Sequence, residues 1–334
     1  MGLEDEGVTP MTRTLSLRAA AVTMTSTDRG ADAPQAVAST DPEPAAAPGT
    51  FAWHTHTGAG GTRRYRLFIP QTLDAGRPAP LVVMLHGCTQ DPDDFARGTR
   101  FNQAAADAGV IVAWPEQAAA LQPMKCWNWH DPAHQAAGGE PAVIAGITRQ
   151  AMAEQAVDPR RVYIAGLSAG AAMAVNTAAS FPQLYAAVGA HGGIPYRAAS
   201  DVPHALAVMR SGTPDPAILA YALQDALGGR ALPLIAIHGG ADRVVAPVNS
   251  RQLAAQWAGV HKLTATAPET STQGGLGVER TVWPGADGHP AVELMIVDGL
   301  AHAWSGGSAQ GTCTDPRGPD ATRLILAFFL AHAR

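Results

Sequence analysis

Short apolar runs alternate with Ala-rich stretches along most of this chain, and the alternation predicts its secondary structure. Runs rich in apolar and β-branched residues predict strands at residues 65–69, 81–85, 110–114, 162–165, 186–190, 234–237 and 292–297. The stretches between and after them predict helices at residues 101–108, 142–156, 169–179, 249–257 and 321–332. Residues 81–85 are apolar at every position, as expected of a strand covered on both faces. The order predicts an α/β protein with a mostly parallel central sheet and helices on both faces.

The first 50 residues differ in composition from the rest. They are rich in Pro, Ala, Thr, Ser and acidic residues, with no sustained apolar period, so residues 1–50 are expected to be a disordered leader or linker. No secretory signal is recognisable there, because the apolar stretch after Met11 is too short. Residues 51–334 are expected to form one large domain. Within it, residues 201–228 predict one or two inserted helices, either a small cap beside the site or a plain connecting pair.

Composition and charge exclude several classes of protein. Of the 334 residues, 46% are hydrophobic and 15% are charged, which excludes a largely disordered chain. The net charge is −5 and no basic cluster occurs, so neither a nucleic-acid nor a membrane partner is expected. No apolar run approaches the roughly 20 residues of a membrane-spanning helix. The three Cys residues lack metal-ligand spacing, and we expect no metal and no cofactor.

The most informative motif is the pentapeptide Gly166-Leu-Ser168-Ala-Gly170. It stands between a predicted strand and a predicted helix, which is the strand-turn-helix context of a nucleophile elbow. The alternative is a Gly-Ser turn that merely caps a helix. In the first interpretation, Ser168 is a nucleophile that needs a base and an acid to orient that base.

The chain offers both partners in the order Ser, Asp, His, each after a predicted strand. Asp242 follows the strand at residues 234–237, and His302 follows the strand at residues 292–297. We therefore expect Ser168 to be the nucleophile, His302 the base and Asp242 the residue that orients the base.

Other residues compete for these roles. His86 and His238 each precede a Gly at the end of a strand, where an imidazole more often bonds loop backbone than takes protons. Asp298 is a rival acid, but it lies very close to His302 on the same loop. The oxyanion of a tetrahedral intermediate needs two N–H donors. We expect them from Ala169, which follows the nucleophile, and from Cys88 in the loop after the strand at residues 81–85.

Five motifs from about Phe51 onward resemble the polyhydroxybutyrate depolymerase family of α/β-hydrolase esterases, which also includes feruloyl and acetylxylan esterases. They are His86-Gly-Cys-Thr-Gln90, Cys126-Trp-Asn-Trp129, Gly166-Leu-Ser-Ala-Gly170, His238-Gly-Gly-Ala-Asp242 and His302-Ala-Trp-Ser-Gly-Gly307. The resemblance implies the α/β-hydrolase fold, the triad Ser168, Asp242 and His302, and an oxyanion hole from Cys88 and Ala169.

The resemblance also implies a function. We expect a serine carboxylester hydrolase that cleaves a short-chain 3-hydroxyalkanoate polyester, or its oligomers, through an acyl-enzyme. The alternative is a feruloyl or acetylxylan esterase on plant cell-wall esters; a remote alternative is a non-catalytic binding protein of the same fold. The resemblance to the family implies that the protein is secreted or periplasmic, although no signal peptide is recognisable. Only residues 303–334 follow His302, so we expect no separate polymer-binding domain after the catalytic domain.

Aromatic residues near these motifs are candidates for substrate contact. Trp127 and Trp129 could lay flat apolar faces along a polyester chain or an aromatic acyl group, or could fill the gap between their loop and the sheet. Trp304 and His191 are expected to line the same mouth. We also expect a disulfide between Cys88 and Cys126, because both lie on loops that should meet at the site; Cys313 would then be unpaired. The sequence leaves the oligomeric state open.

Overall fold

The structure is a computed structural model that describes residues 47–58, 60–74, 76–214 and 216–334. Residues 1–46 of the expected leader therefore lie outside the described residues. The expected boundary at residue 50 falls inside a strand, because β1 already begins at Gly49. The described residues belong to one compact unit.

A ten-stranded sheet forms the centre of this unit, in the order β1-β2-β4-β3-β5-β6-β7-β10-β9-β8. The strands from β4 to β10 in this order run parallel, and the pairs at both edges run antiparallel. The strands of the sheet are β1 (Gly49–Gly58), β2 (Gly61–Pro70), β3 (Ala79–Leu85), β4 (Ile111–Pro115), β5 (Val157–Leu167), β6 (Ala187–His191), β7 (Leu234–Gly239), β8 (Glu269–Gln273), β9 (Leu276–Pro284) and β10 (Pro290–Val297). A small second sheet pairs β11 (Trp304–Ser305) with β12 (Thr314–Asp315).

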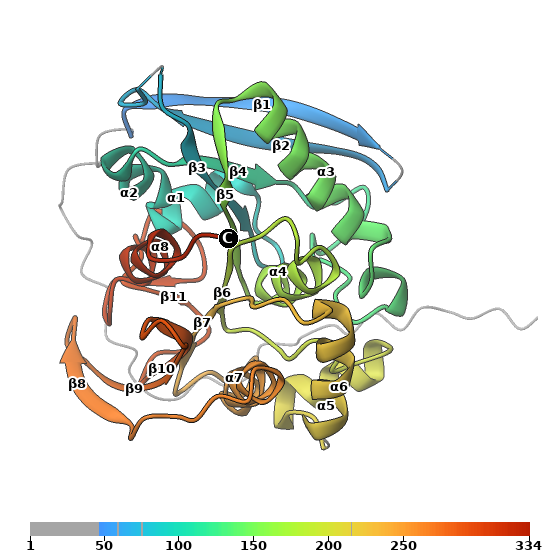
Figure 1. Ribbon diagram of the computed structural model, residues 1–334, viewed down its shortest axis with the longest axis vertical. Coiled ribbons are helices and arrows are strands. Elements are labelled where there is room, and N and C mark those ends of the chain that lie inside the picture. The colour runs from blue at the N-terminus through green and yellow to red at the C-terminus, as the bar shows by residue number, and fades with distance from the viewer. Residues whose placement is uncertain (1–46, 59, 75, 215) are drawn as a thin grey trace, which may run out of the picture. The chain divides into compact units, whose positions relative to one another are not determined.

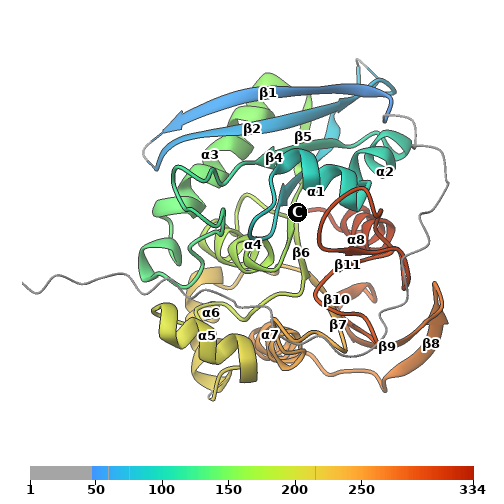
Figure 2. The same cartoon turned by 180° about the vertical axis from the view of Figure 1, so that it is seen from behind.

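Helices cover both faces of the sheet, as Figures 1 and 2 show from opposite sides. They are α1 (Pro92–Thr99), α2 (Phe101–Ala108), the 3-10 turn η1 (Pro132–His134), α3 (Gly139–Glu154), α4 (Ala169–Ser180), α5 (Val202–Ser211), α6 (Pro216–Leu227), α7 (Val248–Val260) and α8 (Ala321–Leu330). One apolar core lies between one face of the sheet and the helices α3, α4, α5, α6 and α7. A second core lies between the other face and the helices α1, α2 and α8. Every residue of β3 is buried because the strand contributes to both cores.

All the strands and helices expected from the sequence occur, with shifts of a few residues at their ends. Five strands were not predicted from the sequence: β1, β8 and β9 lie toward the edges of the large sheet, and β11 and β12 form the small second sheet. β8 shows why: its residues Glu-Thr-Ser-Thr-Gln are polar and mostly exposed, so no apolar pattern marks it. An edge strand is held by backbone hydrogen bonds to one neighbour and needs little apolar surface.

The expected insertion at residues 201–228 forms two helices, α5 and α6, which pack beside α7. The Asn249 side chain donates to Val208 O at 2.9 Å, and the Gln256 side chain donates to Leu219 O at 2.8 Å. These bonds make the pair part of the layer that covers the sheet. None of the helices in the described part of the chain is long and apolar enough to span a membrane.

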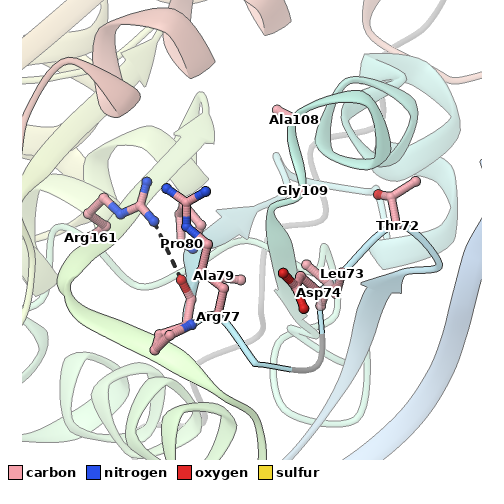
Figure 3. A pocket seen from close by; sticks show the side chains of 10 residues that line it. Thr72, Leu73, Asp74, Arg77, Ala79, Pro80, Ala108, Gly109 and Arg161 are labelled. Atoms are coloured by element: carbon pink, nitrogen blue, oxygen red, sulfur yellow. Dashed lines mark hydrogen bonds between the residues drawn. The ribbon is translucent and has the colours of Figure 1, made fainter.

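The two ends of the parallel strands carry different features. A pocket of about 250 Å³ lies at the amino ends of β3 and β4, lined by Arg77, Gly109 and Arg161 among others (Figure 3). The site residues expected from the sequence instead lie at or after the carboxyl ends of β3, β4, β5, β6, β7 and β10. Parallel strands place these ends at one edge of the sheet, which is where α/β folds bind ligands.

Candidate active site

Ser168 stands on a strained turn between β5 and α4. Its backbone has φ 58° and ψ −122°, a conformation that L-residues with a side chain rarely adopt. The Ser168 N–H donates to His191 O at 2.9 Å, which ties the turn to the end of β6. A Cβ on Gly166 would lie 2.5 Å from the Gly170 backbone, and a Cβ on Gly170 would collide with Leu85 O. The two glycines of the motif are therefore required by close packing of strand and helix.

Asp242 and His302 are joined by a short hydrogen bond. His302 Nδ1 lies 2.6 Å from Asp242 Oδ2, with 14% of the His302 side chain exposed and 1% of the Asp242 side chain. The other carboxylate oxygen, Oδ1, accepts from the backbone N–H groups of Val244 and Val245 at 2.8 and 2.9 Å. Burial alone would raise the pKa of Asp242, but hydrogen bonds from the His238 and His302 side chains outweigh it and hold that pKa far below its usual range. Asp242 is therefore a carboxylate, and His302 presents Nε2 as its proton-accepting atom.

The segment His191-Gly192 brings the elbow and the His302–Asp242 pair together. His191 O accepts from Ser168 N–H, and a Cβ on Gly192 would lie 3.4 Å from His302 Cε1 and 3.9 Å from Asp242 Oδ2. Gly192 has φ +62°, so this close approach also relies on a left-handed backbone. The structure thus places all three expected triad residues around one short segment after β6.

Two backbone N–H groups beside Ser168 are free to donate. Within the described residues, neither Cys88 N–H nor Ala169 N–H has a hydrogen-bond acceptor. Ala169 is the first residue of α4, where helix N–H groups lack intrahelical partners. A Cβ on Gly87, next to Cys88, would lie 3.7 Å from Ser168 Cβ, so the Cys88 loop borders the nucleophile. Both donors expected from the sequence are therefore near Ser168 and unoccupied by protein groups.

The loop that carries Cys88 is held by its neighbours. His86 Nε2 accepts from Gln117 N–H at 3.0 Å, so the His86 proton is on Nδ1, which donates to Gly87 O at 2.8 Å. Burial lowers the pKa of His86 to about 4 and keeps the ring neutral. Gly87 N–H donates to Gln90 Oε1 at 3.0 Å. The groups around the Gly87–Cys88 peptide are thus paired, and the Cys88 N–H is left for a ligand.

A disulfide and a buried carboxylate fix the loop that faces Cys88. Cys88 and Cys126 form a disulfide, and Cys313 is free and exposed. Glu140, at the start of α3, accepts from the Asn128 backbone N–H at 2.8 Å and from the Gln117 side chain at 2.5 Å. Neither Glu140 nor Gln117 was singled out from the sequence, because nothing in their neighbours marks a buried polar cluster. A Glu in the first turn of a helix is ordinarily explained by the helix dipole alone.

The expected substrate contacts need correction. The exposed fractions of Trp127, Trp129, His191 and Trp304 are 1%, 7%, 1% and 0%, so these side chains offer almost no surface to a substrate. Trp127 Nε1 donates to His86 O, and Trp304 Nε1 donates to Thr322 Oγ1. The Trp304 ring stacks on His191 at 5.0 Å between ring centroids. For the two Trp residues of the loop, the structure favours the alternative in which they fill the gap between loop and sheet.

Two rival residues, His238 and Asp298, differ in burial from the residues they would replace. His238 is fully buried and lies beside Asp242, with its Nε2 3.3 Å from Asp242 Oδ2. Asp298 is exposed and shares no hydrogen bond with His302 among the described residues. No group of three His, Cys, Asp or Glu side chains that could hold a metal ion occurs in the part of the chain that the structure describes.

Two proteins of known name are similar to this chain in sequence. The sequence of "Poly(3-hydroxyalkanoate) depolymerase C" from Paucimonas lemoignei is 32% identical over 263 residues, which cover 77% of this chain and 61% of that protein. "Acetylxylan esterase A" from Emericella nidulans is 29% identical over 252 residues, covering 71% of this chain and 79% of that protein. The chain thus spans less than two thirds of the length of the depolymerase.

A solved structure and a family model give the fold and the family. The acetyl xylan esterase from Aspergillus awamori superposes with a TM-score of 0.63 at 21% identity, over 75% of this chain and 94% of that one. This likeness confirms the predicted α/β-hydrolase fold. The model of the family described as "Esterase PHB depolymerase" matches residues 63–273, which hold Ser168, Asp242 and Cys88. The chain therefore belongs to the Esterase PHB depolymerase family.

Proposed function

We propose that this protein is a serine carboxylester hydrolase that cleaves short-chain 3-hydroxyalkanoate polyester, or its soluble oligomers, through an acyl-enzyme. The observation that carries the proposal is the 2.6 Å bond between His302 Nδ1 and Asp242 Oδ2, at the segment His191–Gly192 that also holds the strained turn of Ser168. A base oriented by a buried carboxylate, beside a hydroxyl at the end of the sheet, is the arrangement that acyl transfer requires.

The reaction follows from the roles of these groups. His302 Nε2 takes the Ser168 Oγ proton as the oxygen attacks the ester carbonyl, and Asp242 stabilises the imidazolium that forms. The N–H groups of Cys88 and Ala169 donate to the oxyanion of the tetrahedral intermediate. His302 then gives its proton to the departing alcohol, and an acyl-Ser168 ester remains. Water, activated by His302 in the same way, attacks this ester and releases the acid.

The choice of substrate rests on the relatives. The depolymerase of Paucimonas lemoignei, at 32% identity, supports a polyester of hydroxyalkanoates. The acetylxylan esterase of Emericella nidulans supports an acetylated polysaccharide as the second candidate, and this chain covers more of that relative, 79% against 61%. The same three catalytic residues serve both reactions, so the acyl pocket decides between them.

The test compares substrates on one preparation of the full chain. Hydroxybutyrate monomer and dimer released from amorphous polyhydroxybutyrate particles are measured beside acetate from acetylxylan and ferulate from methyl ferulate. We expect hydroxybutyrate to be the main product, and Ser168→Ala to lower kcat by about 10³-fold or more. Release of acetate or ferulate alone would refute the polyester as substrate and indicate a plant cell-wall ester. Full activity in Ser168→Ala would refute the catalytic role of Ser168.

A further inference from the structure

A second histidine contacts the acid of the triad. His238, at the end of β7, has no exposed surface, and its Nε2 lies 3.3 Å from Asp242 Oδ2. This is the same carboxylate oxygen that His302 Nδ1 approaches to 2.6 Å. Two imidazoles therefore approach one oxygen of Asp242, and of the two only the His302 side chain has exposed surface.

The partners of His238 fix its tautomer. Nε2 lies 2.8 Å from Val245 O and faces Asp242 Oδ2, and both of these oxygens can only accept. The ring proton is therefore on Nε2, and Nδ1 accepts from Ser250 Oγ, which lies 2.6 Å away at the start of α7. Both ring nitrogens are occupied, so this imidazole is unable to act as a base without breaking a buried bond.

The contacts form a clamp on the turn that carries the acid. Asp242 Oδ1 accepts from the N–H groups of Val244 and Val245, while Val245 O accepts from His238 Nε2. His238 thereby holds both the far end of the turn and the carboxylate at its near end. We propose that His238 is a positioning residue, whose Nε2–H fixes the Asp242 carboxylate in the orientation that His302 uses and takes part of the charge on Oδ2. The proposal rests on the catalytic roles proposed above.

This role predicts a change in the pH dependence of catalysis. The titratable groups that face Asp242 are His302, His238 and, more distantly, His191, whose pKa burial lowers to about 3, so that it is neutral. Without the His238 donor, His302 is the only imidazole that contacts the negative charge of Oδ2. That charge then stabilises the protonated, inactive form of His302 more strongly. The acid limb of the kcat/KM profile should therefore move to higher pH.

Two amides of different length provide a matched test. In His238→Gln the amide nitrogen reaches the position of Nε2 and can donate to Val245 O and Asp242. In His238→Asn the amide reaches only the position of Nδ1, so the contact with Ser250 is kept and the donor to Asp242 is lost. His332→Leu removes another buried imidazole, one that follows α8 and bonds Phe328 O, away from the site.

Activity is measured on a soluble ester, per active site counted with a fluorophosphonate. For His238→Asn we expect kcat to fall about 10- to 100-fold, with KM changed less than about threefold. The midpoint of the acid limb of its kcat/KM profile should move up by about half a pH unit or more. His238→Gln should have most of the wild-type kcat, and His332→Leu should have a kcat equal to that of the wild type. Equal kcat values per active site in the Asn and Gln variants, or an equal loss in His332→Leu, would overturn the proposal.

A spectroscopic measurement is independent of turnover. The Nδ1 proton between His302 and Asp242 should have its own downfield NMR resonance, which should move in His238→Asn and stay near its place in His238→Gln. An unmoved resonance in both variants would overturn the positioning role. If the wild type cleaves no ester, the proposed function fails, while the resonance still tests the contact between His238 and the pair.

Discussion

Acid should destabilise this protein through His86, and the size of the effect follows from the structure. His86 is 1% exposed, and burial lowers its pKa from 6.5 to about 4. Protonation would put a second N–H on Nε2, which already accepts from Gln117 N–H, and would leave a charge in the core. The unfolded chain takes up the proton near pH 6.5 and the folded chain only near pH 4, so stability falls as pH falls between these values. From pH 7 to pH 4.5 the loss from this one residue is about 2 kcal/mol.

The assay is urea unfolding at pH 7 and pH 4.5, followed by Trp fluorescence. His86→Asn keeps a donor for Gly87 O but has no group that takes up a proton. We expect its free energy of unfolding at pH 7 to be lower than that of the wild type. Its further loss of stability between pH 7 and pH 4.5 should be smaller than that of the wild type by about 2 kcal/mol. His289→Asn removes an exposed imidazole and serves as the control. Identical pH dependence in wild type and His86→Asn would refute the reasoning that His86 is neutral because it is buried.

Three further predictions concern the packing of the site. Gly170→Ala should destabilise the fold by about 3 kcal/mol or more in urea unfolding, because the new Cβ would collide with the backbone of Leu85 and His86. The control is Gly259→Ala in α7, where a Cβ would have no atom within 4 Å; it should stabilise the fold by about 0.5–1 kcal/mol. Replacing both Cys88 and Cys126 by Ser should lower the free energy of unfolding by up to about 4 kcal/mol, the chain-entropy value for a separation of 38 residues, and an unchanged urea midpoint would argue against it. Trp304→Phe loses the bond to Thr322 and should cost about 1–2 kcal/mol of stability with KM unchanged; a KM raised several-fold would restore a substrate role for Trp304.

The sequence was most informative where a residue is required by backbone geometry. The apolar runs gave the central strands, and the helix over Phe101–Ala108 was predicted with its observed bounds. The positions of Ser168, Asp242 and His302 followed from chain order, since each comes within five residues of the end of a strand of the parallel sheet. A parallel sheet brings such residues to one edge, so the sequence order was enough to predict that they meet.

The partners of the buried aromatic and polar side chains could not be predicted from sequence patterns. Trp304 is buried because His191, Phe95 and Thr322 surround it, and these residues come from three separate parts of the chain. An amphipathic Trp in a loop fits a binding surface and a loop core equally well until its neighbours are known. The contact between His238 and Asp242 could be guessed from their spacing of four, but its geometry depends on Val245 and Ser250.

Exposure separates the roles of the histidines at this edge of the sheet. His86, His191 and His238 are 1%, 1% and 0% exposed, whereas 14% of the His302 side chain is accessible. His86 and His238 have both ring nitrogens bonded, and His191 accepts from Ser305 N–H through Nε2. A buried ring with fixed partners holds a backbone group or a carboxylate in place, because a change of protonation would break its bonds. A base must instead exchange protons with a substrate, and His302, with Nδ1 on Asp242 and Nε2 without a partner among the described residues, meets that requirement.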